Sequence, residues 1–546
     1  MPSVSSRSLA LPSAILPIAI LLLTHISFAA SPRPNANCPE LPGNPHLWKE
    51  QEHWVWKEVC NGREANLLVK YGGSAGPATE KDWPAQRDLT QQFLSTILSD
   101  DAFRKSIPRQ GITIVGAQFR EEINLVNAIL EHDFNLSRSR FGRMLNMRGL
   151  QAQGSVLVLD GYFAGANEAM VLAGATIRGN LDLDGSWVAE PPFNAETTFN
   201  MDSLTVEGNL AMRRASFDHV WLANAKIGGE LDMSATTVKG ELRMLNLNVR
   251  QDLKLQSSVL TTVLLINAAI GRDLAIEGPR IANCIARAKP WSRPQLPPQS
   301  VDLTGTTVGG TLSFGSPCYG PIDTTNWGAG ASLSLRNASV HTLEDGIVCR
   351  ASESHCPNTW PEHLELNGFA YQELGRFIAS GNNDMAARRA EWWIDWLGRH
   401  VPYSPQPYEY LASTLSKRGY KDKAKDILYE GKNRELKESH YPEKAWLWLM
   451  RAFIGYGYRP HYALWWVIAF ALLGAVVLRL SGEGPRNKLP YGIAFSFDML
   501  LPIIKLREYH YGVDLKGWVR YYFYFHKLMG YVLASFLIAG LSGLTK

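Results

Sequence analysis

Four acidic residues in the middle of the chain are the side chains whose spacing best suits chemistry. Asp182 and Asp184 are two residues apart, and Asp160 and Asp232 hold comparable places beside strand-like segments. Paired carboxylates on one face could act as the acid and base of a glycan hydrolase or lyase. Solvated charges at strand edges are the preferred interpretation, so no catalytic residue is predicted.

Aromatic and imidazole side chains of the same region offer a weaker signal. His132 and His219 fall at bends of the repeat described below, where a satisfied polar contact is preferred to a metal site. Four tryptophans could stack on sugars, although isolated Trp residues on an elongated repeat more often fill loops: Trp187, Trp221, Trp291 and Trp327. The sequence lacks GxGxxG after a strand, GxxxxGK[ST], HExxH and GxSxG, so no cofactor site is predicted.

The six cysteines point to disulfides rather than to metal. No CxxC occurs, and every cysteine precedes the C-terminal hydrophobic segments. An even number in this distribution suits an oxidising compartment. Pairing by proximity predicts three bridges and no metal site: Cys38–Cys60, Cys284–Cys318 and Cys349–Cys356.

Composition and the N-terminus restrict the location of the protein. With 55 Lys plus Arg against 51 Asp plus Glu, the net charge of +4 is too balanced for a nucleic-acid binder. Arg7 precedes the apolar run Ile15–Leu23, and Ser27-Phe28-Ala29 supplies small residues at −3 and −1 of a cleavage site. We expect an export signal over residues 1–29. An uncleaved anchor is the alternative.

A repeat of period-2 alternation positions the acidic, aromatic and imidazole candidates. One copy reads Ile227-x-Gly229-x-Leu231-x-Met233, and glycine at the second position suits a corner. Two copies make about 21 residues, because consecutive copies start 10 or 11 residues apart: Val206, Phe217, Ile227, Val238, Val249, Leu260 and Ile270. Stacked short strands of fixed step predict a mainly β fold, a right-handed parallel β-helix (β-solenoid). A β-sandwich is the alternative.

The C-terminal third changes to helical spacing and then to apolar runs. A helix is predicted to open at Pro405, and the runs 463–480 and 528–544 predict two transmembrane helices. Asp498 lies in a short apolar segment between them, which predicts a re-entrant or interfacial element. Five regions follow: the signal peptide (1–29), an N-terminal region with Cys38 and Cys60 (30–110), the β-solenoid (111–345), a helical juxtamembrane region (346–460) and a two-span region (461–546).

Five stretches of the chain resemble a widespread bacterial family of membrane-associated proteins related to pentapeptide-repeat proteins. They are Ala225–Met233, Gln406–Ala412, Gly455–Pro460, Phe497–Ile503 and Ala539–Leu544. The resemblance implies a repeat domain joined to two C-terminal spans, and it supplies no catalytic residue.

Three functions are compatible with this organisation. The preferred one is a non-catalytic scaffold, tethered to the bacterial inner membrane with its repeat domain in the periplasm, that contacts the bilayer and an envelope or membrane protein. A channel component built from the two spans and an envelope carbohydrate-active enzyme are the alternatives. Oligomeric state stays open.

Overall fold

The computed structural model describes most of the chain in well-defined segments. These are residues 38–40, 48–73, 83–164, 168–188, 197–276, 300–315, 327, 330–346, 358, 360–375, 377–378, 381–382, 384–489, 492–501 and 506–542. The predicted signal peptide lies outside them. So do residues 277–299, with Trp291, and the four cysteines of two predicted bridges: Cys284, Cys318, Cys349 and Cys356.

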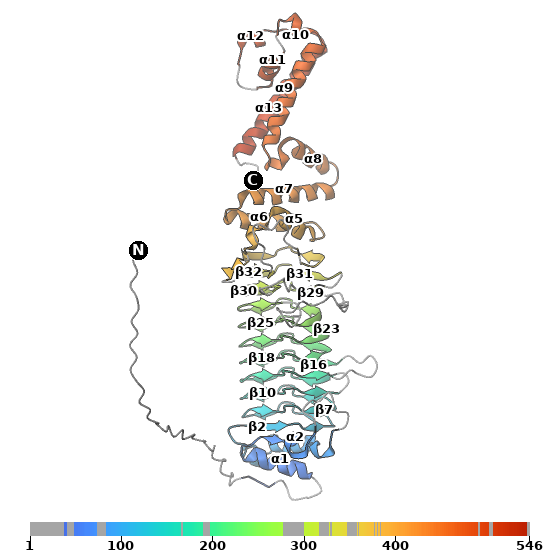
Figure 1. Ribbon diagram of the computed structural model, residues 1–546, viewed down its shortest axis with the longest axis vertical. Coiled ribbons are helices and arrows are strands. Elements are labelled where there is room, and N and C mark those ends of the chain that lie inside the picture. Colours follow the sequence, from blue (N-terminus) through green and yellow to red (C-terminus); the bar gives the residue numbers. More distant parts are fainter. Residues whose placement is uncertain are drawn as a thin grey trace, which may run out of the picture.

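The described chain forms a long column of stacked strands with helices at both ends (Figure 1). The first end is covered by α1 (Glu50–Cys60), α2 (Leu67–Tyr71), η2 (Ala85–Arg87), α3 (Gln91–Ser99) and α4 (Asp101–Arg104). The other end meets η3 (Met385–Ala387), α5 (Ala390–Gly398), α6 (Pro405–Lys417) and α7 (Lys421–Glu438). Helix α6 begins at the predicted Pro405.

The column consists of parallel strands in four stacks. One stack runs through β2 (Ile112–Val115), β6 (Phe134–Asn135), β10 (Val156–Leu157), β14 (Leu181–Asp182), β18 (Leu210–Ala211), β22 (Leu231–Asp232), β25 (Leu253–Lys254), β28 (Leu274–Ala275), β30 (Thr307–Ser313), β32 (Ser339–Glu344) and β34 (Ala370–Leu374). Its neighbour contains β5 (Ile129–Leu130), β9 (Gln151–Ala152), β13 (Thr176–Ile177), β17 (Thr205–Val206), β21 (Lys226–Ile227), β24 (Asn248–Val249) and β27 (Ala269–Ile270), then joins β30.

The other two stacks form the second large sheet. One contains β3 (Gln118–Phe119), β7 (Arg140–Phe141), β11 (Tyr162–Phe163), β15 (Trp187–Val188), β19 (Ser216–Phe217), β23 (Thr237–Arg243) and β26 (Val259–Leu264). The other contains β4 (Ile123–Asn124), β8 (Leu145–Asn146), β12 (Glu168–Val171), β16 (Thr198–Asn200) and β20 (His219–Trp221), shares β23 and β26, and continues to β29 (Ser300–Asp302), β31 (Ser332–Ser334) and β33 (His363–Glu365).

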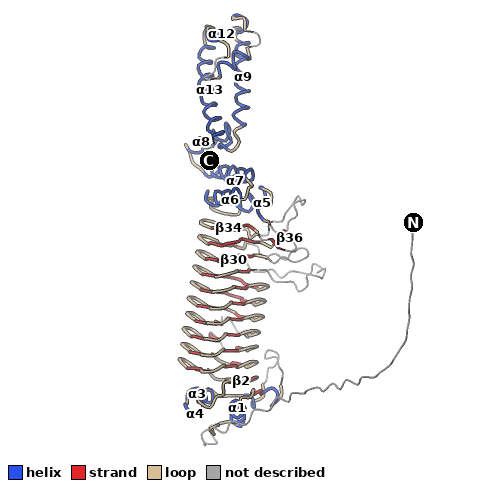
Figure 2. Tube along the Cα trace, turned by 90° about the vertical axis from the view of Figure 1, so that its left-hand side faces the viewer, coloured by secondary structure: helices blue, strands red, loops and turns tan. Residues whose placement is uncertain are grey.

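The strand registers confirm a β-solenoid-like fold with the predicted repeat length. Val206 pairs with Ile227, Ile227 with Val249 and Val249 with Ile270, which gives steps of 21, 22 and 21 residues. Each predicted copy is therefore half of one coil. The tube view in Figure 2 shows these coils stacked along one axis.

The inward residues of one stack form a continuous apolar column. Eleven of them are at most 2% exposed and pair in succession: Ile112, Phe134, Val156, Leu181, Leu210, Leu231, Leu253, Leu274, Leu312, Leu343 and Leu374. Ten steps at the spacing of hydrogen-bonded strands, about 4.8 Å, make a column about 48 Å long.

The strand stacks exceed both predicted boundaries of the solenoid. At the start, β1 (Ala65–Asn66) pairs with β2, so the column begins inside the region predicted as 30–110. At the end, β33 and β34 pair with β31 and β32, so the column continues past the predicted limit at 345. The sequence pattern misses the first end because β1 is too short to show alternation. It misses the other end because the apolar alternation is not continuous through residues 316–326 and 347–357 of the sequence.

Glycines at the bends allow successive coils to approach closely, both at the predicted second position, Gly229, and at Gly228 just before it. Gly228 lies between β21 and β22, and a Cβ there would overlap the carbonyl oxygen of Glu207 in the preceding coil. Its amide donates to the carbonyl of Val206 at 2.8 Å. The strand stacking therefore leaves no room for a side chain at this position.

Replacing Gly228 with Ala should cost about 1–3 kcal/mol of stability, the usual range for overpacking a close contact. Gly398→Ala is a matched control, because nothing lies within 4 Å of a Cβ at this residue of α5. Urea denaturation followed by circular dichroism measures both. Equal midpoints for the two variants would contradict the close-approach interpretation.

Beyond α7 the chain forms a helical hairpin that continues the column (Figure 1). It comprises α8 (Glu443–Ile454), η4 (Gly455–Gly457), α9 (His461–Leu480), α10 (Glu483–Arg486), α11 (Ile493–Leu500), α12 (Glu508–Tyr511) and α13 (Trp518–Ser542). Within the described residues, α9 is the one helix that is long and apolar enough to cross a membrane. The second predicted span falls on α13, which packs against α9 but does not meet this criterion over its described residues.

One stretch predicted as helical is instead a small hairpin. Phe377 lies on β35 (Phe377–Ile378), which pairs antiparallel with β36 (Gly381–Asn382), and helix α5 begins only at Ala390. Its tryptophans Trp393 and Trp396 are buried against the last coil.

Candidate functional site

The four solenoid carboxylates hold turns and neighbouring coils. Asp184 forms an ion pair with Arg213 at 2.6 Å and accepts the amide of the same residue at 2.7 Å. Asp182 accepts the amide of Asp184 at 3.0 Å, and burial raises the pKa of Asp182. Asp232 accepts both the amide and the hydroxyl of Ser234. These contacts are those of turn-stabilising residues.

Asp160 lies beside Asp184 of the next coil, whose carbonyl accepts the Asp160 amide at 2.7 Å. Oδ2 of Asp160 lies 3.7 Å from Nε of Arg138 in the preceding coil, in an exposed pair. Such a surface pair contributes little to stability. Asp182, Asp184 and Asp232 all interact electrostatically with Arg213, and each also accepts a hydrogen bond from its own turn or from the next coil.

The imidazole and indole candidates also have local partners. His219 Nδ1 accepts the amide of Glu241 at 3.0 Å, as expected for a satisfied polar contact, and His132 lies at the bend between β5 and β6. The guanidinium of Arg243 lies 4.7 Å from the ring of Trp221. Trp187 meets Tyr162 edge-on at 5.5 Å, and Trp327 lies 6.1 Å from Phe314.

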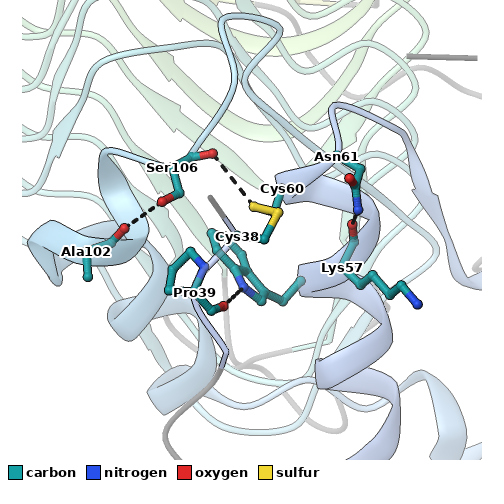
Figure 3. The surroundings of a disulfide bond; sticks show 8 residues. Cys38, Pro39, Lys57, Cys60, Asn61, Ala102 and Ser106 are labelled. Atoms are coloured by element: carbon teal, nitrogen blue, oxygen red, sulfur yellow. Dashed lines mark hydrogen bonds between the residues drawn. A yellow bond between two sulfur atoms is a disulfide. The ribbon is translucent and has the colours of Figure 1, made fainter. Parts of the chain in front are cut away.

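A disulfide joins the chain before α1 to the end of α1. Cys38 and Cys60 are bonded, with their Cα atoms 5.9 Å apart (Figure 3). Beside the bond, Trp56 Nε1 donates to the carbonyl of Pro39 at 2.8 Å, and Trp56 packs edge-on against Phe103 of α4. The bridge therefore fixes the N-terminal segment onto the helices that cover the first coil.

A group of buried polar residues meets in the helical hairpin, around the predicted Asp498. Its carboxylate, on α11, is fully buried and accepts three hydrogen bonds. These come from the amides of Leu506 and Arg507, at 3.0 and 3.2 Å, and from Nδ1 of His510 at 2.9 Å. The Tyr511 hydroxyl donates to the Asp498 carbonyl at 3.3 Å.

A second buried imidazole lies on the other side of α11. His526 of α13 is fully buried, with Nε2 3.0 Å from the Ser496 carbonyl and 3.4 Å from its hydroxyl. The Tyr522 hydroxyl lies 3.3 Å from His526 Nδ1. We call Ser496, Asp498, His510 and His526 the hairpin polar cluster.

Two glycines allow α11 to reach this position. A Cβ on Gly474 of α9 would overlap the Ser496 hydroxyl, and one on Gly530 of α13 would overlap the Leu500 carbonyl. Small residues that allow close packing of membrane helices are the signal that the sequence offers at Gly530. Ser496, His510 and His526 carry no comparable signal, since their partners are distant in sequence.

No family model, curated protein or solved structure matches this chain. In the described part of the chain, no three His, Cys, Asp or Glu side chains are grouped to hold a metal ion. The hairpin polar cluster contains one carboxylate and two imidazoles whose hydrogen bonds join α11 to α12 and α13. This arrangement holds a short helix between two long ones.

Asp498→Ala should release the segment that contains α12. The variant removes the acceptor of two amides and of one imidazole, and a hydrogen bond to a charged group contributes about 1.5–3 kcal/mol. Amide exchange at Leu506 and Arg507 should then accelerate by about 10- to 100-fold. Hydrogen exchange with mass spectrometry, on the protein in detergent, measures the exchange rate of this segment. Asp514→Ala is the control, because the Asp514 side chain is exposed. Unchanged exchange at both amides would contradict this role of Asp498.

Proposed function

We propose that this protein is a non-catalytic β-solenoid scaffold, tethered to the bacterial inner membrane, that presents its long surface to an envelope or membrane protein. The main support is the column of eleven inward residues, from Ile112 to Leu374, that pair from one coil to the next. This column is continued by the helical hairpin, which contains the apolar helix α9 (Figure 1). A rod about 48 Å long on a membrane anchor positions a binding surface at a fixed distance from the bilayer.

The proposal includes two membrane spans, α9 and α13, and a right-handed winding of the coils. Exposed apolar side chains on both helices support the two spans: Leu464, Leu472, Leu473 and Val476 on α9, and Phe525, Leu528 and Ile538 on α13. The right hand is the one that strand twist and parallel crossovers favour. The resemblance to membrane-associated relatives of pentapeptide-repeat proteins is part of the same proposal.

The periplasm is the proposed location of the solenoid. The predicted export signal and the Cys38–Cys60 bridge support it, since structural disulfides persist in oxidising compartments. Residues up to about Tyr462 then lie outside the cytoplasm, and Gly482 to Arg520 lie inside. Labelling of a cysteine placed at Lys488 tests the orientation: reaction in intact cells without permeabilisation would invert it.

An outward-face alanine scan in cells distinguishes scaffold from enzyme. Exposed positions such as Lys226 and Asn248 are replaced, with folding, partner recovery and turnover of envelope glycans measured for each variant. The scaffold proposal expects folded variants that lose a specific partner. A single outward carboxylate whose loss abolishes glycan turnover would replace the scaffold with an enzyme.

A channel component is the second candidate, favoured by the hairpin polar cluster. Buried ionisable side chains within membrane segments commonly mark pathways for ions or protons. Ion flux through vesicles containing the purified protein tests it. Flux abolished by Asp498→Ala, in a variant that still folds, would favour the channel over the scaffold.

A further inference from the structure

Helix α8 exposes large aromatic side chains on both of its flanks. Trp446 is 58% exposed and Trp448 is 62% exposed, whereas Leu447 between them is buried. Successive residues of a helix are about 100° apart, so the two indoles project to opposite sides of Leu447. Two large exposed indoles on one helix would be costly on a surface that faces only water, and they indicate a partner surface.

The position of α8 is fixed by packing on two sides. On one side Leu447 is buried against Leu436 of α7 and Tyr456 of η4. On the other, Ile454 packs with Ala463 of α9 and Leu533 of α13. Helix α8 therefore lies between the helices that cover the solenoid and the two long helices α9 and α13 (Figure 1).

Contacts between α8 and α9 also hold α8 in this position. The reversal from α8 to α9 uses three consecutive residues with positive φ, from Gly455 to Gly457. Trp466 of α9 then donates its indole N–H to the Ala452 carbonyl of α8 at 2.8 Å and stacks on Phe453 at 4.8 Å. The exposed indoles of α8 are thus held at the level where the apolar surface of α9 begins.

A second exposed aromatic group lies at the far end of the hairpin. Trp518, Tyr521 and Tyr524 begin α13, and each is more than half exposed. Residues 518 and 538 of α13 are 20 positions apart, about 30 Å along a helix. That separation equals the usual thickness of the hydrocarbon core, and Trp and Tyr concentrate at its two boundaries.

We infer that α8 lies flat in the interface between the inner membrane and the periplasm. Trp446 and Trp448 are then at the level where lipid headgroups meet acyl chains. Lys444 and Arg451 are exposed on the same helix and form no ion pair with any described residue, so they suit contact with lipid phosphates. The inference rests on the proposed membrane tether. In this arrangement the solenoid is close to the bilayer surface, and helices α5–α7 lie between its last coil and α8.

Depth measurement with spin labels tests the inference on the full chain. A ketone-bearing amino acid is placed at 446 or 448 and coupled to a nitroxide, which leaves the native cysteines untouched. The protein is reconstituted in vesicles of phosphatidylethanolamine with a minority of phosphatidylglycerol. Matched controls are Leu473, half exposed in the middle of α9, and Val126, 38% exposed on the solenoid. Relaxation by oxygen and by a water-soluble nickel complex gives the depth of each label.

The expected result is an interfacial depth at 446 and 448, a deep position at 473 and an aqueous one at 126. Aqueous readings at 446 and 448 with a deep reading at 473 would overturn the inference and leave the tether in place; α8 would then face solvent or a protein. Aqueous readings at all four sites would overturn both. Readings at 446 and 448 as deep as at 473 would also overturn it.

A second measurement covers the case in which a label disturbs α8. Brominated lipids quench tryptophan fluorescence on contact, so the parent chain is compared with the Trp446→Phe, Trp448→Phe double variant. Subtracting the fluorescence of the variant from that of the parent gives the signal of Trp446 and Trp448. Lipids brominated near the headgroup should quench this signal most strongly. A difference signal that no brominated lipid quenches would overturn the inference.

Discussion

Arg388→Met should lower the free energy of unfolding by about 3–5 kcal/mol, because it leaves a buried carboxylate without its cation. Both side chains of the Arg388–Asp345 pair are only 2% exposed, with Nη1 and Nη2 at 2.6 and 2.8 Å from the two carboxylate oxygens. The indole N–H of Trp360 lies 3.4 Å from the same carboxylate, and the guanidinium lies 4.4 Å from the ring of Trp392. The pair thus fastens the covering helix α5 to the end of β32.

The neighbouring arginine provides the control. Arg389 pairs with Glu391 on the surface, where the two side chains are 67% and 71% exposed. Arg389→Met should therefore change stability by about 0.5 kcal/mol or less. Urea denaturation in detergent, followed by tryptophan fluorescence, reports on the region because several buried tryptophans surround the pair. If the two variants unfold at the same midpoint, the buried pair does not hold this end of the column.

Sequence predicts the interior of the column well because burial there follows a strict period. The inward positions of a copy such as Val206, Leu210 and Met212 are at most 1% exposed. Alternation of apolar and other residues is a direct consequence of a strand with one buried face. The step of 10 or 11 residues then reports the half coil, since each side of a coil must meet the corresponding side of the next.

The tight turns at the corners of the coils are not predicted by the apolar alternation. Glycine at the second position marks one bend, but the tight turns lie elsewhere and adopt positive φ. Asn224, Asn246 and Asn267 occupy these turns on successive coils, and the Asn246 amide group donates to Oδ1 of Asn224 at 3.0 Å. Asparagine tolerates this conformation better than most residues. Its recurrence at 21–22 residues is a signal in the sequence that apolar alternation alone overlooks.

Contacts between distant segments are the part that local patterns cannot supply. Arg388 and Asp345 are 43 residues apart, and the described residues between them include β33, β34, the β35–β36 hairpin and η3. Asp498 is recognisable as an ionisable residue in an apolar segment, yet its partner His510 lies 12 residues further along, on α12. Each pair depends on how whole elements pack, and no spacing rule connects its members.

The inward column supports a second large effect, at a position that the repeat identifies. Leu231→Ala should destabilise the solenoid by about 2–5 kcal/mol, the range for truncating a fully buried leucine. Leu231 is 0% exposed and pairs with Leu210 below and Leu253 above, both also fully buried. The cavity cannot collapse easily, because the hydrogen bonds between coils fix the spacing of the backbones.

A control variant needs an outward side chain that makes few contacts. Asp232, the outward neighbour, holds a turn through Ser234, and Arg243 pairs with Glu241 and lies over Trp221, so replacing either side chain removes real contacts. Lys226 is exposed on the adjacent stack, and Lys226→Ala should stay within about 0.5 kcal/mol of the parent. Because each coil contacts only its neighbours, hydrogen exchange should also show the loss at Leu231 concentrated in β18, β22 and β25. A loss spread evenly over the column would mean that the solenoid unfolds as one unit, and an unchanged midpoint would mean that Leu231 is not part of its core.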